Sequence, residues 1–335
     1  MEEKRQIDLI RDSGGNDDIG SEEDGAIIDM KNIGGRLLII KERAIYEMVM
    51  ADDIDPERTN INLPTTIQKR IIDKGAESET VSRTLLTAIT LFRSEYILIS
   101  VDCDKLIGLA IDMLSEISIL EKEINEFQGM EKSESDEYDE RKNKNVSFKL
   151  PSIANLETKC KTIFQKANHI EQILMNIITE FYPKLGLNKQ SHFPNFYEKL
   201  KALYGEEDSF VKFIGKTVYF MSVIYEFRNG FDHRLDNIKV FNFELQPNGK
   251  IIAPSIELNH KTIKLNRTSL NEFLKITITN MLEIIESTFA FLAEKNKKQE
   301  GLPRQVRLIP EDKRRNEFVK YSFWMPLGNE GFYNQ

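Results

Sequence analysis

Cysteine is scarce in this sequence, and with it the usual signs of a metal centre or a disulfide scaffold. The 335 residues include two cysteines, Cys103 and Cys160, which lie far apart. Without paired Cys or Cys/His spacing, neither a zinc site nor a disulfide framework is predicted. Both cysteines fall in apolar surroundings, so we interpret them as buried free thiols in a reducing cytoplasm. No metal and no cofactor are expected.

Long apolar runs are also missing. No stretch reaches the roughly eighteen uninterrupted apolar residues that indicate a membrane-spanning helix. The charged start of the chain, residues 1–6, is not followed by the apolar core of a signal peptide. Gly-rich phosphate loops and the HExxH and Gly-x-Ser-x-Gly motifs are absent too. We therefore expect no membrane segment and a cytoplasmic protein.

Positive charge is in short supply. Lys and Arg number 46 against 54 Asp and Glu, which gives a net charge of −8. This balance excludes a protein that coats nucleic acid through bulk positive charge, although a local basic cleft remains compatible with it. The hydrophobic fraction of 40%, with 20 Phe, is enough for a sizeable core. The length fits one large domain or two ordinary ones.

Composition and periodicity divide the chain into four parts. Residues 1–33, rich in Gly, Asp and Glu, are predicted to be an N-terminal arm that is mostly disordered or loosely docked. Residues 34–76 are predicted to form a helix and a loop that pack on a bundle. Residues 77–296 form the bundle itself, and 297–335 make a C-terminal extension with short strands.

The predicted fold class is mainly α, with an antiparallel helical bundle as its main part. Apolar residues recur at helical spacing in five segments, with a charge-dense linker expected at 129–145. Near 238–265 the period changes to that of strands around Pro247-Asn248-Gly249, which predicts an inserted β-hairpin. The five helical segments are 77–101, 104–128, 152–183, 206–227 and 268–296.

An unusual ending closes the fourth of these helices. Arg228 continues an apolar stripe and is followed by Asn229-Gly230, a helix-stop signal, and then by His233. We expect the helix to end at this stop, so that the exit loop carries His233 back beside Arg228. A guanidinium binds phosphate, and an imidazole exchanges protons near neutral pH. The pair predicts phosphate chemistry in one cleft.

The pattern Arg228-Asn229-x3-His233 at the end of a bundle helix resembles the motif of the HEPN superfamily. The resemblance covers residues 77–296. It implies a metal-independent endoribonuclease that acts on RNA as a homodimer. It also implies a prokaryotic defence or toxin–antitoxin setting, with an antitoxin or defence protein as partner. It implies that His233 acts on the 2′-hydroxyl or the leaving oxygen, that Arg228 holds the phosphate and that Asn229 orients either group. The tyrosine found after the histidine in some members is replaced by Leu235.

Further candidates surround this motif. Asp232 and Arg234 lie within it, and Arg83 and Arg93 are candidate phosphate contacts, unless they pair with neighbouring acids. His192 is a second candidate for stacking on RNA, together with Phe193 and Phe196, although core filling is the more ordinary role for these aromatics. Two alternatives stay open: an inactive HEPN-like module that binds a protein partner or a nucleotide, and an ordinary helix end whose Arg and His pair with carboxylates.

Overall fold

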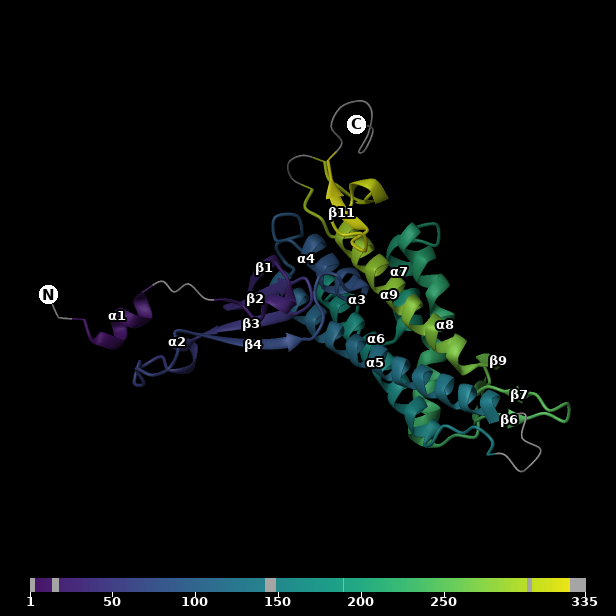
Figure 1. The fold of residues 1–335 in the computed structure, drawn as a ribbon. Helices are drawn as coiled ribbons and strands as arrows, with labels where there is room; N and C mark the ends of the chain where they lie inside the picture. The colour runs from purple at the N-terminus through teal and green to yellow at the C-terminus, as the bar shows by residue number, and fades with distance from the viewer. Residues whose placement is uncertain (1–3, 14–17, 142–148, 189, 300–302, 326–335) are drawn as a thin grey trace. The chain divides into compact units, whose positions relative to one another are not determined.

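Tertiary contacts divide the chain into two units in the computed structural model. The first unit comprises residues 1–108 and 299–335, and the second comprises residues 109–298. The structure describes residues 4–13, 18–141, 149–188, 190–299 and 303–325 (Figure 1). The last four residues of the predicted 129–145 linker lie outside these ranges.

The first unit is built around a four-stranded antiparallel sheet with the strand order β1-β2-β3-β4. A second sheet pairs β10 with β11. A short helical stretch with a π-type turn runs through α3, η2 and α4. The elements are α1 (Gln6–Asp12), η1 (Glu22–Asp24), β1 (Ile27–Ile33), β2 (Arg36–Lys41), β3 (Ile45–Met50), α2 (Ala51–Ile54), β4 (Thr66–Ile72), α3 (Glu79–Val81), η2 (Ser82–Leu86), α4 (Thr87–Leu91), β10 (Gln305–Leu308), η3 (Glu311–Lys313) and β11 (Tyr321–Trp324).

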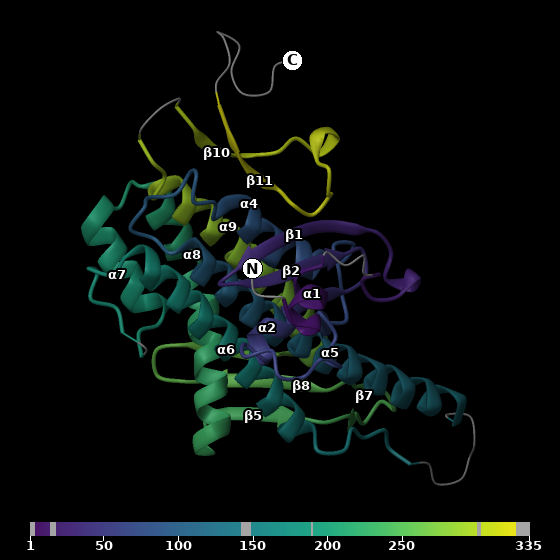
Figure 2. The same cartoon turned by 90° about the vertical axis from the view of Figure 1, so that its left-hand side faces the viewer.

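The second unit consists of long helices and a set of short strands. The long helices of this unit are α5, α6, α8 and α9 (Figure 2). Strands β6 and β7 lie near the C-terminal end of α5 (Figure 1). The sheet has the order β5-β8-β9, and β6 pairs with β7. The elements are α5 (Cys103–Arg141), α6 (Leu156–Phe181), α7 (Phe193–Tyr204), α8 (Ser209–His233), β5 (Ile238–Phe241), β6 (Glu244–Leu245), β7 (Ile251–Ile252), β8 (Ser255–Asn259), β9 (Lys264–Ser269) and α9 (Leu270–Lys295).

The core of the second unit is aromatic where α6, α8 and α9 meet. The rings of Phe164 and Phe227 stack with their centroids 4.5 Å apart, and Phe231 and Phe273 contact the same pair at 5.8 and 5.6 Å. Phe164 and Phe227 are fully buried. Such close ring packing fixes the three helices against one another.

The predicted fold class, a mainly α bundle, is wrong. Of the residues that the structure describes, 51% are helical and 18% are in strands, with several small sheets, so the fold is mixed α and β. The helix predicted within 34–76 is replaced by strands, because the apolar runs 37–40 and 45–50 form β2 and β3, paired through contacts such as Ile39 with Tyr46. Runs this short have no helical period, and their β-branched residues suit a sheet.

Of the two alternatives for residues 1–33, disorder is wrong for the described part of that segment, which holds α1, η1 and β1, and the arm is docked through α1. The predicted linker is wrong up to Arg141, because α5 continues through it. Glu, Lys, Arg and Met, which favour helices, make up about half of this stretch, and Tyr138 is buried and donates a hydrogen bond to the carbonyl oxygen of Gly249 at 3.2 Å. The hairpin insertion and the strand pair of the C-terminal extension are confirmed.

Helix α9 is long and apolar enough to cross a membrane, but 67% of its most apolar window is buried inside the protein. Core helices of soluble proteins meet the same criteria of length and composition. Its apolar residues face the other helices of the second unit, as the contact of Phe273 with Phe227 shows.

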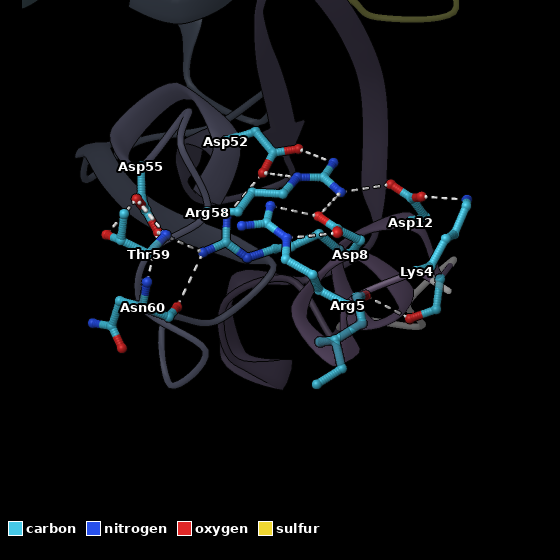
Figure 3. A network of polar contacts seen from close by, with 12 residues as sticks. Lys4, Arg5, Asp8, Asp12, Asp52, Asp55, Arg58, Thr59 and Asn60 are labelled. Carbon is cyan, nitrogen blue, oxygen red and sulfur yellow. Dashed lines mark hydrogen bonds and ion pairs between the residues drawn. The ribbon is translucent and has the colours of Figure 1, made fainter. Parts of the chain in front are cut away.

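Ion pairs hold α1 against the loop that follows α2 (Figure 3). Arg11, whose side chain is 1% exposed, pairs with Asp52 at 2.9 Å and with Asp55 at 3.3 Å. Arg58 contacts Asp52 at 2.7 Å and also reaches carboxylates on α1. A hydrogen bond from Arg5 lowers the pKa of Asp8 to about 2, and backbone hydrogen bonds from Asn60 and Thr59 lower the pKa of Asp55 to about 2.

Acid is expected to release α1. Because the folded-state pKa values of Asp8 and Asp55 lie below the ordinary aspartate value, their stabilising effect is complete above that value and is lost as the pH falls from about 4 to about 2. The protection of the α1 amides from hydrogen exchange, relative to the intrinsic rate at each pH, should therefore fall across this range. In Arg58→Gln this loss of protection should begin at a higher pH, because three carboxylates lose a partner. Unchanged protection of α1 down to about pH 2 would contradict the assignment.

Candidate functional site

Helix α8 places the predicted motif, but it does not end where the sequence indicates. The helix continues through Asn229-Gly230 to His233, and Arg234 closes it in the left-handed conformation with φ 50°. Gly230 has a packing role instead. A side chain there would begin 2.2 Å from Cδ1 of Ile238, the first residue of β5. The predicted helix stop at Asn229-Gly230 is therefore wrong. Gly230 lies inside the helix, where its missing side chain leaves room for Ile238 of β5.

Arg228 is half-buried and belongs to a polar cluster between α6 and α8. Its Nε lies 3.0 Å from Oδ2 of Asp232, and its Nη1 donates to Oδ1 of Asn229 at 3.2 Å. Asp232 also accepts from Gln165 at 2.8 Å and pairs with Lys161 at 3.3 Å. Partial burial raises the pKa of Asp232, but the hydrogen bonds from Gln165 and Lys161 and the charge of Arg228 outweigh it, so that the pKa lies below its usual value.

His233 points away from this cluster. Five helical positions separate it from Arg228, which corresponds to about 140° around the helix axis. The imidazole is exposed, and no hydrogen bond or ion pair joins it to another side chain in the described part of the chain. The chain reversal at Gly230, on which the prediction of a single cleft depended, is wrong because α8 continues to His233.

The remaining residues of the motif have separate roles. Asn229 accepts from Arg228 and makes no contact with His233, so it does not orient the imidazole in this structure. Asp232 anchors Arg228 to α6. Arg234 is exposed and lines a cavity of about 440 Å³ beside β5, together with Glu157 and Lys239.

The two further arginines belong to the first unit and not to this cluster. Arg83 is 5% exposed and pairs with Glu79 at 2.8 Å, so its guanidinium is not presented to a substrate. Arg93 pairs with Glu95 at 3.4 Å and lies over the ring of Tyr96. The pairing of both arginines with neighbouring acids, one of the two predicted alternatives, is confirmed.

A cleft of about 250 Å³ in the second unit was not predicted. It lies between α6, the start of α7 and α8, and its lining includes Glu171, His192, Tyr225 and Glu226. The ring of His192 lies against Tyr225, with the centroids 4.2 Å apart. Phe193 and Phe196 are fully buried, which confirms their predicted core-filling role, and the alternative in which these two rings stack on RNA beside His192 is wrong.

The sequence did contain a signal for this cleft. Glu171 follows Ala167 by four positions and precedes Leu174 by three, so that it interrupts the apolar stripe of α6 with a charge. Glu171 is buried at 1% exposure, as its place in the stripe requires. A buried carboxylate needs a partner, so a glutamate within the apolar stripe of a helix indicates a polar site at that position.

No site for a metal is formed by the described residues, since no three His, Cys, Asp or Glu side chains are grouped closely enough to hold an ion. Cys103 and Cys160 are free and buried, as predicted from their apolar surroundings. Burial raises the pKa of Cys160 to about 12, so its thiol is not an activated nucleophile.

In comparisons with known proteins, the chain matches no family model, no curated protein and no solved structure.

Proposed function

We propose that this chain is a metal-independent endoribonuclease whose active site is shared between two copies. The observation that carries the proposal is the exposed imidazole of His233, which has no side-chain partner among the described residues and lies within two helical turns of a half-exposed guanidinium. Lys161 and Arg234 add positive charge near the same end of α8. A local basic surface of this kind is what an acidic chain needs to hold RNA.

The need for a second copy follows from the helix geometry. In one chain, about 140° around α8 separates the positions of Arg228 and His233, so the two side chains leave the helix on different faces. A two-fold axis beside the last turns of α8 would place Arg228 of one copy opposite His233 of the other, and would do so twice. The homodimer that the HEPN resemblance implies is therefore part of this proposal, as is its cytoplasmic defence setting with an antitoxin or similar partner.

The chemistry uses only these groups and the RNA itself. His233 takes the proton of a ribose 2′-hydroxyl, and the 2′-oxygen attacks the adjacent phosphorus. The bond from phosphorus to the 5′-oxygen breaks, and the imidazolium returns the proton to that oxygen. Arg228 stabilises the charge on the phosphoryl oxygens. The products are a 2′,3′-cyclic phosphate and a 5′-hydroxyl.

A non-catalytic binding module is the second candidate. It is favoured by the cluster in which Arg228 contacts Asp232 and Asn229, while Asp232 joins Gln165 and Lys161 of α6. A guanidinium used in this way stabilises the packing of two helices. In this alternative the second unit binds a protein partner or a nucleotide and cleaves nothing.

Incubation of the full chain with RNA in EDTA separates the two candidates. A nuclease should cut RNA in the chelator and leave 2′,3′-cyclic phosphate ends. His233→Ala and Arg228→Ala should each lower the rate at least about 10²-fold, as expected for the loss of a proton-transfer or phosphate-binding group. The exposed residues His169 and Arg315 provide controls, and His169→Ala and Arg315→Ala should retain wild-type rates.

Mixing the two inactive variants tests whether the site is shared. After co-expression of His233→Ala with Arg228→Ala, half of the dimers should be mixed, and each mixed dimer keeps one intact site of two. The mixture should therefore recover about a quarter of the wild-type rate. No recovery would contradict the shared site. No cleavage by the wild type, together with a lower Tm for Arg228→Ala, would support the binding module instead.

A further inference from the structure

The cleft around Glu171 has the composition of a ligand site. Its lining comes from α6, the start of α7, α8 and the segment before β9, all within the second unit. The volume of about 250 Å³ is enough for a small organic molecule. Met221, Pro194 and Ile263 supply apolar walls, and Ser222 and Asn195 supply polar groups.

Glu171 carries an incompletely satisfied carboxylate beneath this cleft. Its Oε1 lies 3.3 Å from Nδ1 of His192 and 3.3 Å from the backbone nitrogen of Phe193. Its Oε2 is buried and has no hydrogen-bond partner. Because a buried polar atom without a partner costs about 1–3 kcal/mol, and more when it is charged, such an atom in a native fold needs an explanation.

A second carboxylate and an aromatic ring border the same space. The side chain of Glu226 is 15% exposed, and Nδ1 of the His260 ring lies 3.9 Å from its Oε2. The ring of Tyr225 lies against His192. Among the described residues that line the cleft, none is Lys or Arg. Two carboxylates, those of Glu171 and Glu226, therefore border the cleft beside the imidazole of His192.

We propose that this cleft binds a small organic cation with a primary ammonium or guanidinium group. Two carboxylates repel an anion, and an uncharged apolar ligand would leave the charge of Glu171 uncompensated. The acidic and imidazole groups do not form a cluster that holds a metal ion. An ammonium group instead donates hydrogen bonds to Glu226 and Ser222, is attracted by Glu171 and lies against the face of Tyr225. The alkyl part of the ligand packs on Met221, Pro194 and Ile263.

This site is independent of the proposed RNA cleavage. It lies on the part of α8 that carries Ser222, Tyr225 and Glu226, and neither Arg228 nor His233 lines the cleft. Its test uses binding alone, so its failure and the failure of the nuclease proposal are distinguishable.

Binding of pentylamine, agmatine and 1-pentanol to the full chain tests the proposal by calorimetry at low salt. Pentylamine and 1-pentanol share one alkyl chain and differ in the charged head group. Both amines should bind and raise the Tm, and 1-pentanol should bind at least about tenfold more weakly than pentylamine. Glu171→Gln and Glu226→Gln should each weaken binding of the amines at least about tenfold.

Glu198, exposed on α7 and outside the cleft, gives a matched control, and Glu198→Gln should bind the amines as the wild type does. If Glu171→Gln does not fold, Glu226→Gln carries the test, because its side chain is partly exposed. The proposal is overturned if neither amine binds the wild type, if 1-pentanol or Mg²⁺ alone binds as tightly as the amines, or if Glu198→Gln weakens binding as much as Glu226→Gln.

Discussion

Gly75→Ala is expected to destabilise the first unit by roughly 2–4 kcal/mol, because the added methyl group would meet backbone atoms. A Cβ built at Gly75 lies 2.2 Å from the carbonyl oxygen of Lys41, 2.4 Å from the carbonyl carbon of Glu42 and 2.5 Å from the nitrogen of Arg43. These three atoms form the turn between β2 and β3. No rotation of a side chain can relieve the clash.

The surrounding hydrogen bonds prevent the backbone from moving apart. The nitrogen of Ala76 donates to the carbonyl oxygen of Lys41, and that of Glu77 donates to the carbonyl oxygen of Glu42, both at 2.9 Å. Any displacement that makes room for the methyl group breaks these bonds, which link the segment after β4 to the sheet. The cost of overpacking is thereby added to the cost of buried backbone groups that lose their partners.

Fluorescence of Trp324, the one tryptophan in the chain, reports on this unit through β11. The midpoint temperature of this fluorescence transition should fall by on the order of 10 °C in Gly75→Ala. Gly108→Ala provides the opposite control, because a Cβ at this position in α5 meets nothing within 4 Å and alanine favours a helix by about 1 kcal/mol. A Gly75→Ala transition within 2 °C or so of the wild type would show that the two segments are not packed this closely.

The long helices could be predicted from the sequence because their apolar residues recur over many turns. Helix α9 was expected at 268–296 and is found at Leu270–Lys295, and α6 was expected at 152–183 and is found at Leu156–Phe181. Over such lengths the period of 3.6 residues is unambiguous. The six residues of β3 gave no comparable signal, so the choice between helix and strand was decided by pairing with β2 and β4.

The order of the N-terminal segment could not be predicted from composition. Its charged residues indicate solvation when they are considered one by one. In the structure Arg11 pairs with Asp52, which lies 41 positions later in the chain, and Arg58 pairs with Asp12, which lies 46 positions earlier. Partners so distant in sequence are determined by the fold, and no local pattern specifies them.

The candidate site shows the same division between local and distant information. The spacing of Arg228 and Asp232 by four positions already predicts that the two side chains can pair on one face of a helix. Whether the helix ends at Gly230 depends on Ile238, a residue of the following strand that occupies the space above the glycine. The direction of His233 was therefore fixed by packing that the motif does not contain.

Phe227→Ala is expected to lower the free energy of unfolding of the second unit by about 3–5 kcal/mol. Phe227 is fully buried, and its ring contacts those of Phe164, Phe231 and Phe273 from three helices. Alanine would leave a cavity that these rings cannot fill without leaving their stacked positions. A loss of this size is a large share of the 5–15 kcal/mol that holds a typical domain together.

Denaturant unfolding followed by far-UV circular dichroism measures this loss, and hydrogen exchange of α6, α8 and α9 locates it. Phe227→Leu should cost less, about 1.5 kcal/mol, because most of the volume is kept, and Leu235→Ala at an exposed position should cost less than about 0.5 kcal/mol. Equal effects of Phe227→Ala and Leu235→Ala would contradict the aromatic core. Because Phe227 directly precedes Arg228, a folded Phe227→Leu that keeps its cleavage rate while Arg228→Ala loses it would separate the packing of α8 from its chemistry.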